Sequence, residues 1–379
     1  MEKNKRVCHI TSMDNWRDAR IFERACLGLA RNGFEVSFIV TTPDENVVES
    51  DYPVSFLWLK KRDGIRRRIF SSIEAIEKAI SIDADIYHFH DPEILFFVNK
   101  LRKRKPKAKI IFDIHENYRG RFEMWKKTRL FSPILKKLYS WAETYMMHKI
   151  NGYVVVSDSM KLIYKDVKVP GTVVRNTIYF PNYSDFIINE DKDETLKRII
   201  TSGSHSYQRH VVQTVAAIKY INTKEKIVFN FVGKYKLNAE EQIQKQIEKD
   251  NIQDYVTLDG MLTRQKNIER ISESFCGCVF YEDNPNNRVG IPNRIFEYMF
   301  AGIPIVVSDF PELRKIITEA DCGVVVDSSN PHSIAEGIQF LLDHPDKAKM
   351  MGENGRKALE TTMNYQVDLE TLINFYADV

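Results

Sequence analysis

The chain has 379 residues, which is too many for one ordinary hydrophobic core, so we expect two domains. Its 43% hydrophobic and 28% charged residues exclude a disordered chain, and no apolar run is long enough for a signal peptide or a membrane span. Of the five scattered cysteines, only Cys276 and Cys278 are close, and without a second Cys/His pair they make a poor zinc site. These features predict a cytoplasmic protein with reduced thiols.

Charge is distributed unevenly between the two halves. Residues 1–190 contain 33 Lys and Arg against 24 Asp and Glu, whereas the remainder contains 22 against 28. The basic half includes "IRRRIFSSI" (65–73), "KLRKRKPKAK" (100–109) and "RGRFEMWKKTRLFSPILKKL" (119–138), which mix cations with Phe122, Trp125 and Phe131. This mixture favours peripheral contact with an anionic membrane. The alternative is a basic face that serves only solubility.

In chain order, the first half alternates strands with helices. We predict strands over residues 6–12, 34–40, 85–90, 108–115 and 152–157, and helices over 19–32, 93–103 and 134–150, with Gly33 ending the first helix. The polar, weakly periodic stretch 176–195 is the predicted join.

The second half repeats this alternation. We predict strands over residues 198–203, 226–233, 255–260, 276–281, 303–308 and 323–327, with helices near 209–221, over 238–249, from Pro292–Asn293 to Gly302, and on to the C-terminus. Two such series predict two doubly wound, Rossmann-like domains with parallel sheets, over residues 1–190 and 191–379, facing a central cleft. Ligands are then expected beyond the carboxyl ends of the strands.

One acid, Glu297, lies inside the predicted helix after Pro292, off its apolar arc. A surface salt bridge with Arg294, three residues earlier, is the simple interpretation. The position favours a ligand contact, because the helix follows a Gly/Pro loop after a buried strand, and Ala301 and Gly302 leave space beside the acid.

The segments "PNRIFEYMFAGIPIVVSDFPELRKII" and "DCGVVVDSSNPHSIAEGIQFLLDHPDKAKMMGENGRKAL" resemble family 4 glycosyltransferases, most strongly over residues 270–360. The resemblance continues more weakly through "DARIFERACLGLARNGFEVSFIV" and "DIYHFHDPEIL". It implies the GT-B fold, with an N-terminal acceptor domain, a C-terminal nucleotide-sugar domain and a last helix that packs back on the first domain. It also implies retaining transfer of a hexose-type sugar from a nucleotide-diphosphate sugar to a glycan or lipid-linked acceptor in cell-surface polysaccharide synthesis, at the inner face of the membrane.

The resemblance implies that Glu297 hydrogen-bonds the ribose of the donor. A second family glutamate, eight positions earlier, is replaced here by Val289, so the sugar contacts depart from the family pattern. The intervening loop is expected to substitute through backbone amides, and Glu282 is an alternative carboxylate. The loop residues expected at the donor are Gly290, Ile291, Pro292 and Asn293.

The diphosphate is expected to lie beside "IITSGSHSYQRHV" (199–211). The family places one cation directly after the glycine and another a few residues later. Here Gly203 is followed by Ser204, so Arg209 takes the second role and Lys234 becomes a candidate helper. The alternative for Arg209 is an exposed arginine at a helix start.

In the first half, the resemblance implies that His115 touches the transferred sugar, with Glu116 beside it. His88 alternates with His90, and we expect one of them to face the cleft, preferring His90 with Asp91. Where relatives have a Gly-rich loop, this chain offers Asp14, Asp18 and Arg20: Arg20 for phosphate and the acids for the acceptor, with an Asp18 helix cap as the alternative.

The expected mechanism is front-face transfer, in which the protein stabilises the leaving diphosphate by electrostatics. We expect no metal or other cofactor, because the family does not need one and His88 and His90 have no apparent third ligand. A GT-B nucleotide-sugar 2-epimerase and a non-catalytic glycosyltransferase-like partner subunit stay open. Dinucleotide and nucleic-acid binding lack their motifs.

Overall fold

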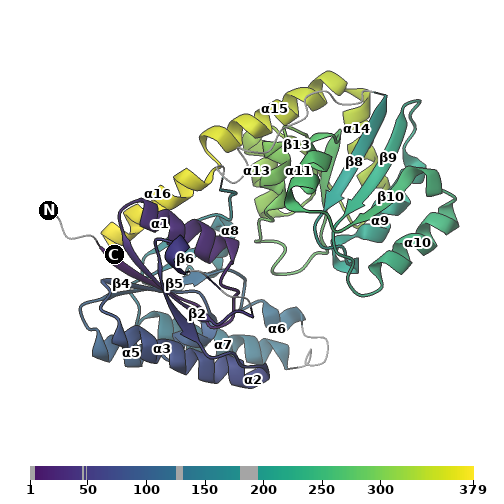
Figure 1. Ribbon diagram of the computed structural model, residues 1–379. Helices are drawn as coiled ribbons and strands as arrows, with labels where there is room; N and C mark the ends of the chain where they lie inside the picture. The colour runs from purple at the N-terminus through teal and green to yellow at the C-terminus, as the bar shows by residue number, and fades with distance from the viewer. Residues whose placement is uncertain (1–4, 45–46, 48, 125–130, 180–194) are drawn as a thin grey trace. The chain divides into compact units, whose positions relative to one another are not determined.

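The computed structural model describes residues 5–44, 47, 49–124, 131–179 and 195–379 (Figure 1). The chain divides into two compact units, one formed by Met1–Tyr179 with Tyr365–Val379 and the other by Phe180–Asn364. The division therefore precedes residue 190, and the last helix belongs to the first unit rather than to the second. Most of the predicted join lies outside the described residues, as does Trp125.

The first unit contains a parallel sheet with the strand order β3-β2-β1-β4-β5-β6-β7. Its central strands are buried throughout, because helices cover both faces of the sheet. The strands are β1 (Arg6–Ile10), β2 (Glu35–Thr41), β3 (Ser55–Leu59), β4 (Ile86–Phe89), β5 (Lys109–Ile114), β6 (Gly152–Val155) and β7 (Gly171–Val173).

The helices of the first unit cover both faces of this sheet, with α3, α5 and α7 along one face and α1 with α16 on the other (Figure 1). Apolar residues of α16 join the core formed with the helix after β1. The helices are η1 (Ala19–Cys26), α1 (Leu27–Arg31), η2 (Glu49–Asp51), α2 (Gly64–Arg66), η3 (Arg67–Ser71), α3 (Ser72–Ser81), α4 (Pro92–Leu95), α5 (Val98–Arg104), α6 (Arg121–Met124), α7 (Ser132–Met147), α8 (Asp158–Ile163) and α16 (Tyr365–Asp378).

The second unit contains a parallel sheet with the order β10-β9-β8-β11-β12-β13. The strands are β8 (Leu196–Ser202), β9 (Lys226–Val232), β10 (Val256–Gly260), β11 (Cys276–Val279), β12 (Ile305–Ser308) and β13 (Gly323–Val326). Helix α9 packs against α10 and α14, while α12 packs against α11 and α15. The helices are η6 (Tyr207–Arg209), α9 (Val211–Ala217), η7 (Ile218–Tyr220), α10 (Ala239–Asp250), η8 (Gln253–Tyr255), α11 (Arg264–Ser272), α12 (Arg294–Phe300), α13 (Pro311–Ala320), α14 (Pro331–Asp343) and α15 (Pro345–Thr361).

Both sheets confirm the prediction of two doubly wound α/β domains. The strand order reverses between β1 and β4 in the first unit and between β8 and β11 in the second. In open parallel sheets this reversal opens a crevice at the carboxyl ends, which is where ligands bind. Within the described residues, no helix is long and apolar enough to span a membrane.

Three local predictions were wrong or incomplete. The sequence analysis missed β3 and β7, which are short strands at the two edges of the first sheet. The single helix predicted over 93–103 is two helices, α4 and α5, separated at Phe96–Phe97. The helix containing Glu297 begins at Arg294 and ends as predicted before Gly302, whose φ of +64° suits a residue without a side chain.

Candidate functional site

At the carboxyl edge of the second sheet, the loops after β8 and β9 are held together by their backbones. His205 donates its N–H to Lys234 O at 2.8 Å, and Lys236 donates to His205 O at 2.9 Å. Gly233 has a φ of +135°, and a Cβ added there would lie 1.8 Å from Gly203 O. Only glycine permits this approach, so the loop carrying Gly203 and Ser204 is fixed beside Lys234.

Two guanidinium groups lie against one aromatic ring at this edge. Arg209, from the loop after β8, and Arg294, from the start of α12, have guanidinium carbons 5.2 and 5.0 Å from the centroid of the Tyr281 ring. Tyr281 follows β11, so the three side chains meet where the strand order reverses. A Cβ added at Gly203 would lie 3.5 Å from Arg209 Nη1, which places the Arg209 guanidinium over the exposed Gly203 backbone.

The electrostatics of this group favour an anion. Arg294 is buried and donates Nη1 to Ser202 O at 2.8 Å, but its Nε and Nη2 have no hydrogen-bond partner among the described residues. Burial and the charge of Arg294 lower the pKa of Arg209. Although burial opposes it, the two arginines also lower the pKa of Tyr281. The charges of Arg209 and Arg294 repel each other, and Arg294 has two donors without a partner among the described residues. An anionic ligand would reduce the repulsion and accept from these donors.

Glu297 lies in α12, one turn after Arg294, with a half-buried side chain. The Arg294 guanidinium donates to Ser202 O and lies against the Tyr281 ring. Burial lowers the pKa of Arg294, but Tyr281 and, to a smaller extent, the Glu297 carboxylate raise it above its ordinary value. The simple salt-bridge interpretation therefore misses the contacts that Arg294 makes with the rest of the edge.

The loop before α12 is a compact turn. Val289 and Gly290 both donate their N–H groups to Asn286 O, at 3.2 and 2.9 Å. The Val289 side chain, which stands where the family has its first glutamate, is 7% exposed and packs as an apolar residue. Ile291 is also buried, whereas Pro292 is half-buried and Asn293 is exposed as the residue preceding α12.

The remaining donor-side residues surround this edge. Lys234 is exposed and Ser204 half-buried. Glu282 donates its backbone N–H to Gln208 O at 2.7 Å, which ties the Tyr281 segment to the Arg209 loop.

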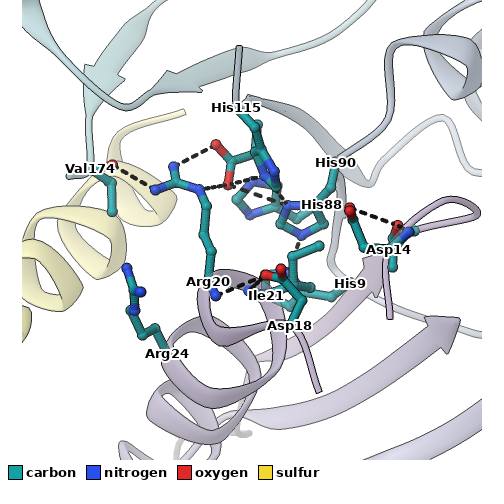
Figure 2. A network of polar contacts seen from close by, with 12 residues as sticks. His9, Asp14, Asp18, Arg20, Ile21, Arg24, His88, His90, His115 and Val174 are labelled. Atoms are coloured by element: carbon teal, nitrogen blue, oxygen red, sulfur yellow. Dashed lines mark hydrogen bonds and ion pairs between the residues drawn. The ribbon is translucent and has the colours of Figure 1, made fainter. Parts of the chain in front are cut away.

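In the first unit, a buried polar network lies under the carboxyl ends of β1, β4 and β5 (Figure 2). Arg20 donates Nε and Nη2 to the two oxygens of Asp113, at 2.9 and 2.7 Å. Its Nη1 donates to Val174 O at 2.9 Å and to Asn176 Oδ1 at 3.0 Å. Four of its donor interactions are thus made inside the unit, so the structure assigns Arg20 to holding Asp113 rather than to a phosphate.

A chain of histidines continues from Asp113. His90 Nδ1 lies 3.1 Å from His115 Nε2, and His90 Nε2 lies 3.0 Å from His9 Nδ1. Asp113 Oδ2 is 3.3 Å from both His90 Nδ1 and His115 Nε2. Of these groups only His115 is partly exposed, with 20% of its side chain accessible, so it is the member that a ligand can reach.

The charges of this network follow from burial and from Arg20. Burial alone would raise the pKa of Asp113, but the Arg20 charge and the hydrogen bonds of His115 and His90 hold it well below its ordinary value. Burial lowers the pKa of His9 and of His90. For His115 burial acts in the same direction, but the Asp113 carboxylate outweighs it and raises the pKa.

The expectation that one of His88 and His90 would face a cleft was wrong. Residues two apart in a strand point to the same side, and both rings are 1% exposed and stacked with centroids 4.9 Å apart. His88, His90 and Asp113 have ligand atoms within 4.8 Å of one another, so a third metal-type ligand does exist. However, Asp113 already accepts from Arg20, and both nitrogens of His90 face other histidines. A cation would have to displace these contacts.

Asp91 connects the two strands at the reversal in the first unit. Its Oδ2 accepts from Ser12 N at 2.5 Å and from Thr11 Oγ1 at 3.1 Å, and the same hydroxyl contacts Asp14 Oδ2 at 3.2 Å. Burial and the nearby Asp14 raise the pKa of Asp91 to about 7. Asp14 is half-buried and lines an open hollow of about 530 Å³ formed by the segments that follow β1, β2 and β3.

The other two predicted acids have local partners. Asp18 caps η1 by accepting from the N–H groups of Arg20 and Ile21, which is the alternative that the sequence left open. Glu116 pairs with Arg121 at 2.6 Å. Sequence analysis missed Asp113, although a carboxylate two residues before His115, in the strand that leads to it, was a usable signal. It also missed Tyr281 and the role of Arg294, which depend on contacts between distant loops.

Comparison with known families accounts for both halves of the chain. Residues 184–358 match the model of the group 1 glycosyl transferases, and residues 19–178 match the model of glycosyltransferase family 4. The chain is of the group 1/family 4 glycosyltransferase type. The resemblance seen in the sequence is thereby confirmed.

Similarity to individual curated proteins is moderate. The chain is 32% identical over 82 residues to spore coat protein SA of Bacillus subtilis (strain 168), and 24% identical over 120 residues to the capsular polysaccharide biosynthesis glycosyltransferase CapM of Staphylococcus aureus. These matches cover 21% and 30% of this chain but only 22% and 32% of those proteins. Alpha-D-kanosaminyltransferase of Streptomyces kanamyceticus is 21% identical over 312 residues, covering 79% of this chain and 75% of the relative.

Solved structures of glycosyltransferases share the fold. Sucrose-phosphate synthase of Thermosynechococcus elongatus superposes with a TM-score of 0.74 at 14% identity, covering 99% of each chain. Anabaena HepE in complex with UDP gives 0.75 at 9% identity, covering 100% of each chain. The predicted GT-B fold is therefore confirmed.

Proposed function

We propose that this glycosyltransferase-type chain transfers a hexose-type sugar, with retention of configuration, from a nucleoside-diphosphate sugar to a glycan or lipid-linked acceptor in cell-surface polysaccharide synthesis. One observation carries the proposal: Arg209 and Arg294 both lie against the Tyr281 ring at the strand reversal of the second sheet, and Arg294 has two buried donors without a partner among the described residues. A diphosphate is the anion whose oxygens could engage both guanidinium groups.

In this proposal the diphosphate lies beside Arg209, with Arg294 behind it and the Gly203–Ser204 backbone and Lys234 alongside. Glu297, one helical turn from Arg294, accepts hydrogen bonds from the ribose hydroxyls. Both positive charges stabilise the departing diphosphate, so their effect is larger on the transition state than on the bound donor. The CapM and HepE relatives, one a capsular polysaccharide glycosyltransferase and the other crystallised with UDP, support the donor and acceptor classes.

The acceptor side is proposed for the first unit. Asp14 lines the open hollow after β1, and His115 is the exposed end of the histidine network. Polar groups on these loops can bind hydroxyls of a glycan, with Asp113 holding His115 from behind and the Thr11 hydroxyl linking Asp14 to Asp91. The unit's basic excess suits an acceptor that carries negative charge, and the enzyme would work at the cytoplasmic face of the membrane.

Thermal unfolding in the presence of nucleoside diphosphates and their sugars tests the proposal. A ligand at 100 times its dissociation constant stabilises the fold by about 2.7 kcal/mol, which gives a clear rise in melting temperature. We expect at least one uridine or guanosine diphosphate sugar to raise the melting temperature. When a suitable acceptor is present, the nucleoside diphosphate of that donor should be released. If no nucleoside diphosphate changes the melting temperature, the chain is a non-catalytic relative. If a bound donor changes configuration at carbon 2 without an acceptor, it is an epimerase.

A further inference from the structure

Helix α7, together with Phe131 immediately before it, carries a row of large, exposed apolar side chains. Phe131, Ile134, Leu138, Trp141 and Tyr145 are 65%, 60%, 59%, 70% and 53% exposed. Their spacing of three and four residues places them on one face of the helix. We call these five residues the α7 stripe. Scattered exposed apolar residues are ordinary, but five in a continuous row mark a surface that binds something.

The opposite side of α7 is fixed to the unit. Met146 and Met147 are buried, and Glu143 is fully buried in an ion pair with Arg119 at 2.7 Å. The α7 stripe is therefore presented by a helix whose orientation is set by packing. Trp141 and Tyr145 stack with ring centroids 6.1 Å apart, and Lys149 Nζ lies 5.0 Å from the centroid of Tyr145.

The charge of this face identifies its occupant. The exposed residues of the segment 131–148 outside the α7 stripe are Pro133, Lys137 and His148, and none is acidic. The only acid within α7 is Glu143, which is inaccessible, and the neighbouring Lys136 pairs with Glu123 of α6. If a second copy of the chain packed on this helix through the same face, cations would meet cations with no exposed acids of α7 to pair with them. An anionic surface is therefore the partner that complements this face.

We propose that the α7 stripe is a membrane-binding surface, which enters the headgroup region of a bilayer containing anionic lipid. Aliphatic side chains would reach the acyl boundary, Trp141 and Tyr145 would lie at the interface where such rings are favoured, and Lys137 would meet lipid phosphates. The proposal sharpens the membrane contact expected from the basic segments by assigning it to one helix face. It does not depend on the proposed sugar transfer.

Vesicle co-sedimentation of the full chain tests this surface without any donor or acceptor. We expect binding to phosphatidylcholine vesicles that contain phosphatidylglycerol and much weaker binding to phosphatidylcholine alone. Leu138→Asn should weaken binding by roughly tenfold, because one apolar side chain loses its burial. Lys137→Glu should remove most of the preference for phosphatidylglycerol. Both positions are exposed, so the variants should unfold like the wild type.

The matched control is Leu237→Asn, at a leucine of the second unit that is 90% exposed and outside the α7 stripe. It should bind vesicles like the wild type. The emission of Trp141 should also shift to shorter wavelength on binding, and this change should be absent in Trp141→Tyr. Equal losses in the Leu138 and Leu237 variants would overturn the proposal. So would a concentration-dependent dimer that Leu138→Asn abolishes, since a second copy would then cover the face.

Discussion

Arg20 and Asp113 form a two-point ion pair inside the first unit, in which both oxygens of the carboxylate accept from one guanidinium, and the two side chains are only 9% and 5% exposed. The pair links η1, the helix that follows β1, with strand β5, and it places a negative charge directly behind His115. A buried charge without its partner is costly, so each residue of the pair depends on the other.

Asp113→Asn should therefore lower the free energy of unfolding by about 3–5 kcal/mol, because it leaves the Arg20 guanidinium buried without a counter-charge. Urea denaturation measures the change. The control is Lys100→Ala, which removes an exposed pair with Glu77 at 2.9 Å and should cost less than about 1 kcal/mol. Similar losses in the two variants would show that the Arg20–Asp113 pair contributes no more than a surface contact.

His115 should titrate above its ordinary pKa, because the Asp113 carboxylate favours the imidazolium. A raised pKa in the folded state means that this group stabilises the fold below the unfolded value of 6.5, and the contribution is lost as pH rises through the folded pKa. NMR titration of the His115 ring should show the raised pKa in the wild type. In Arg20→Lys the side chain can no longer hold both oxygens of Asp113, so a carboxylate that moves away from His115 should give a lower pKa. The more direct variant is Asp113→Asn, in which Asp113 no longer opposes burial and the Arg20 charge, so the pKa of His115 should fall below 6.5. An unchanged His115 pKa in a folded Asp113 variant would contradict the network.

Asp91 should give a pH dependence of the same direction as His115, but over a lower pH range. Its folded pKa of about 7 lies above the ordinary 3.8, so ionisation is harder in the folded state and the stability contribution of Asp91 falls as pH rises between these values. Asp91→Asn retains an oxygen for Ser12 and Thr11 but cannot ionise. Its stability relative to the wild type should therefore improve from pH 5 to pH 8, by at most about 1.4 kcal/mol per pH unit for one proton. Urea midpoints at four pH values measure this difference, and parallel curves for the two proteins would refute it.

Gly233 should be the least replaceable of the glycines with positive φ. An alanine Cβ there meets Gly203 O at 1.8 Å, so Gly233→Ala must separate the loops after β8 and β9. We expect a loss of about 1–3 kcal/mol from this clash, added to the strain of the backbone conformation. Gly33 has a φ of +83° with no atom within 4 Å of an added Cβ, so Gly33→Ala carries the strain alone. Thermal unfolding of both variants compares them, and equal losses would mean that the two loops are not held in contact.

The fold was largely predictable because each sheet is buried on both faces. Continuous apolar runs such as residues 108–115 and 303–308 show their strands without knowledge of neighbours, and glycines at 33 and 302 show where helices end. The strands that were missed, β3 and β7, are less buried, so their sequences carry a weaker signal. The break at Phe96–Phe97 was missed because both halves of the segment are apolar and helical in pattern.

The site was predictable only where a residue's role depends on its own strand or helix. The position of His115 after β5 and the place of Glu297 in its helix follow from local pattern. The roles of Arg20 and Arg294 do not, because their partners, Asp113 and Tyr281, lie 93 and 13 residues away along the chain and meet them only in the folded sheet. Arg20 was expected at a phosphate because a cation at a helix start suits an anion. The buried carboxylate of Asp113 is that anion.

Isothermal titration of the nucleoside diphosphate that stabilises the wild type tests the donor site most directly. Arg209→Ala should raise its dissociation constant by roughly tenfold or more, and should remove most of the preference for the diphosphate over the monophosphate. Glu297→Ala should weaken both nucleotides and remove the preference for the ribonucleotide over its 2′-deoxy form. Lys245→Ala, at a side chain that is 70% exposed on α10, removes the same charge as Arg209→Ala and should leave all these constants unchanged. Wild-type affinity in the Arg209 and Glu297 variants would contradict the proposed donor site.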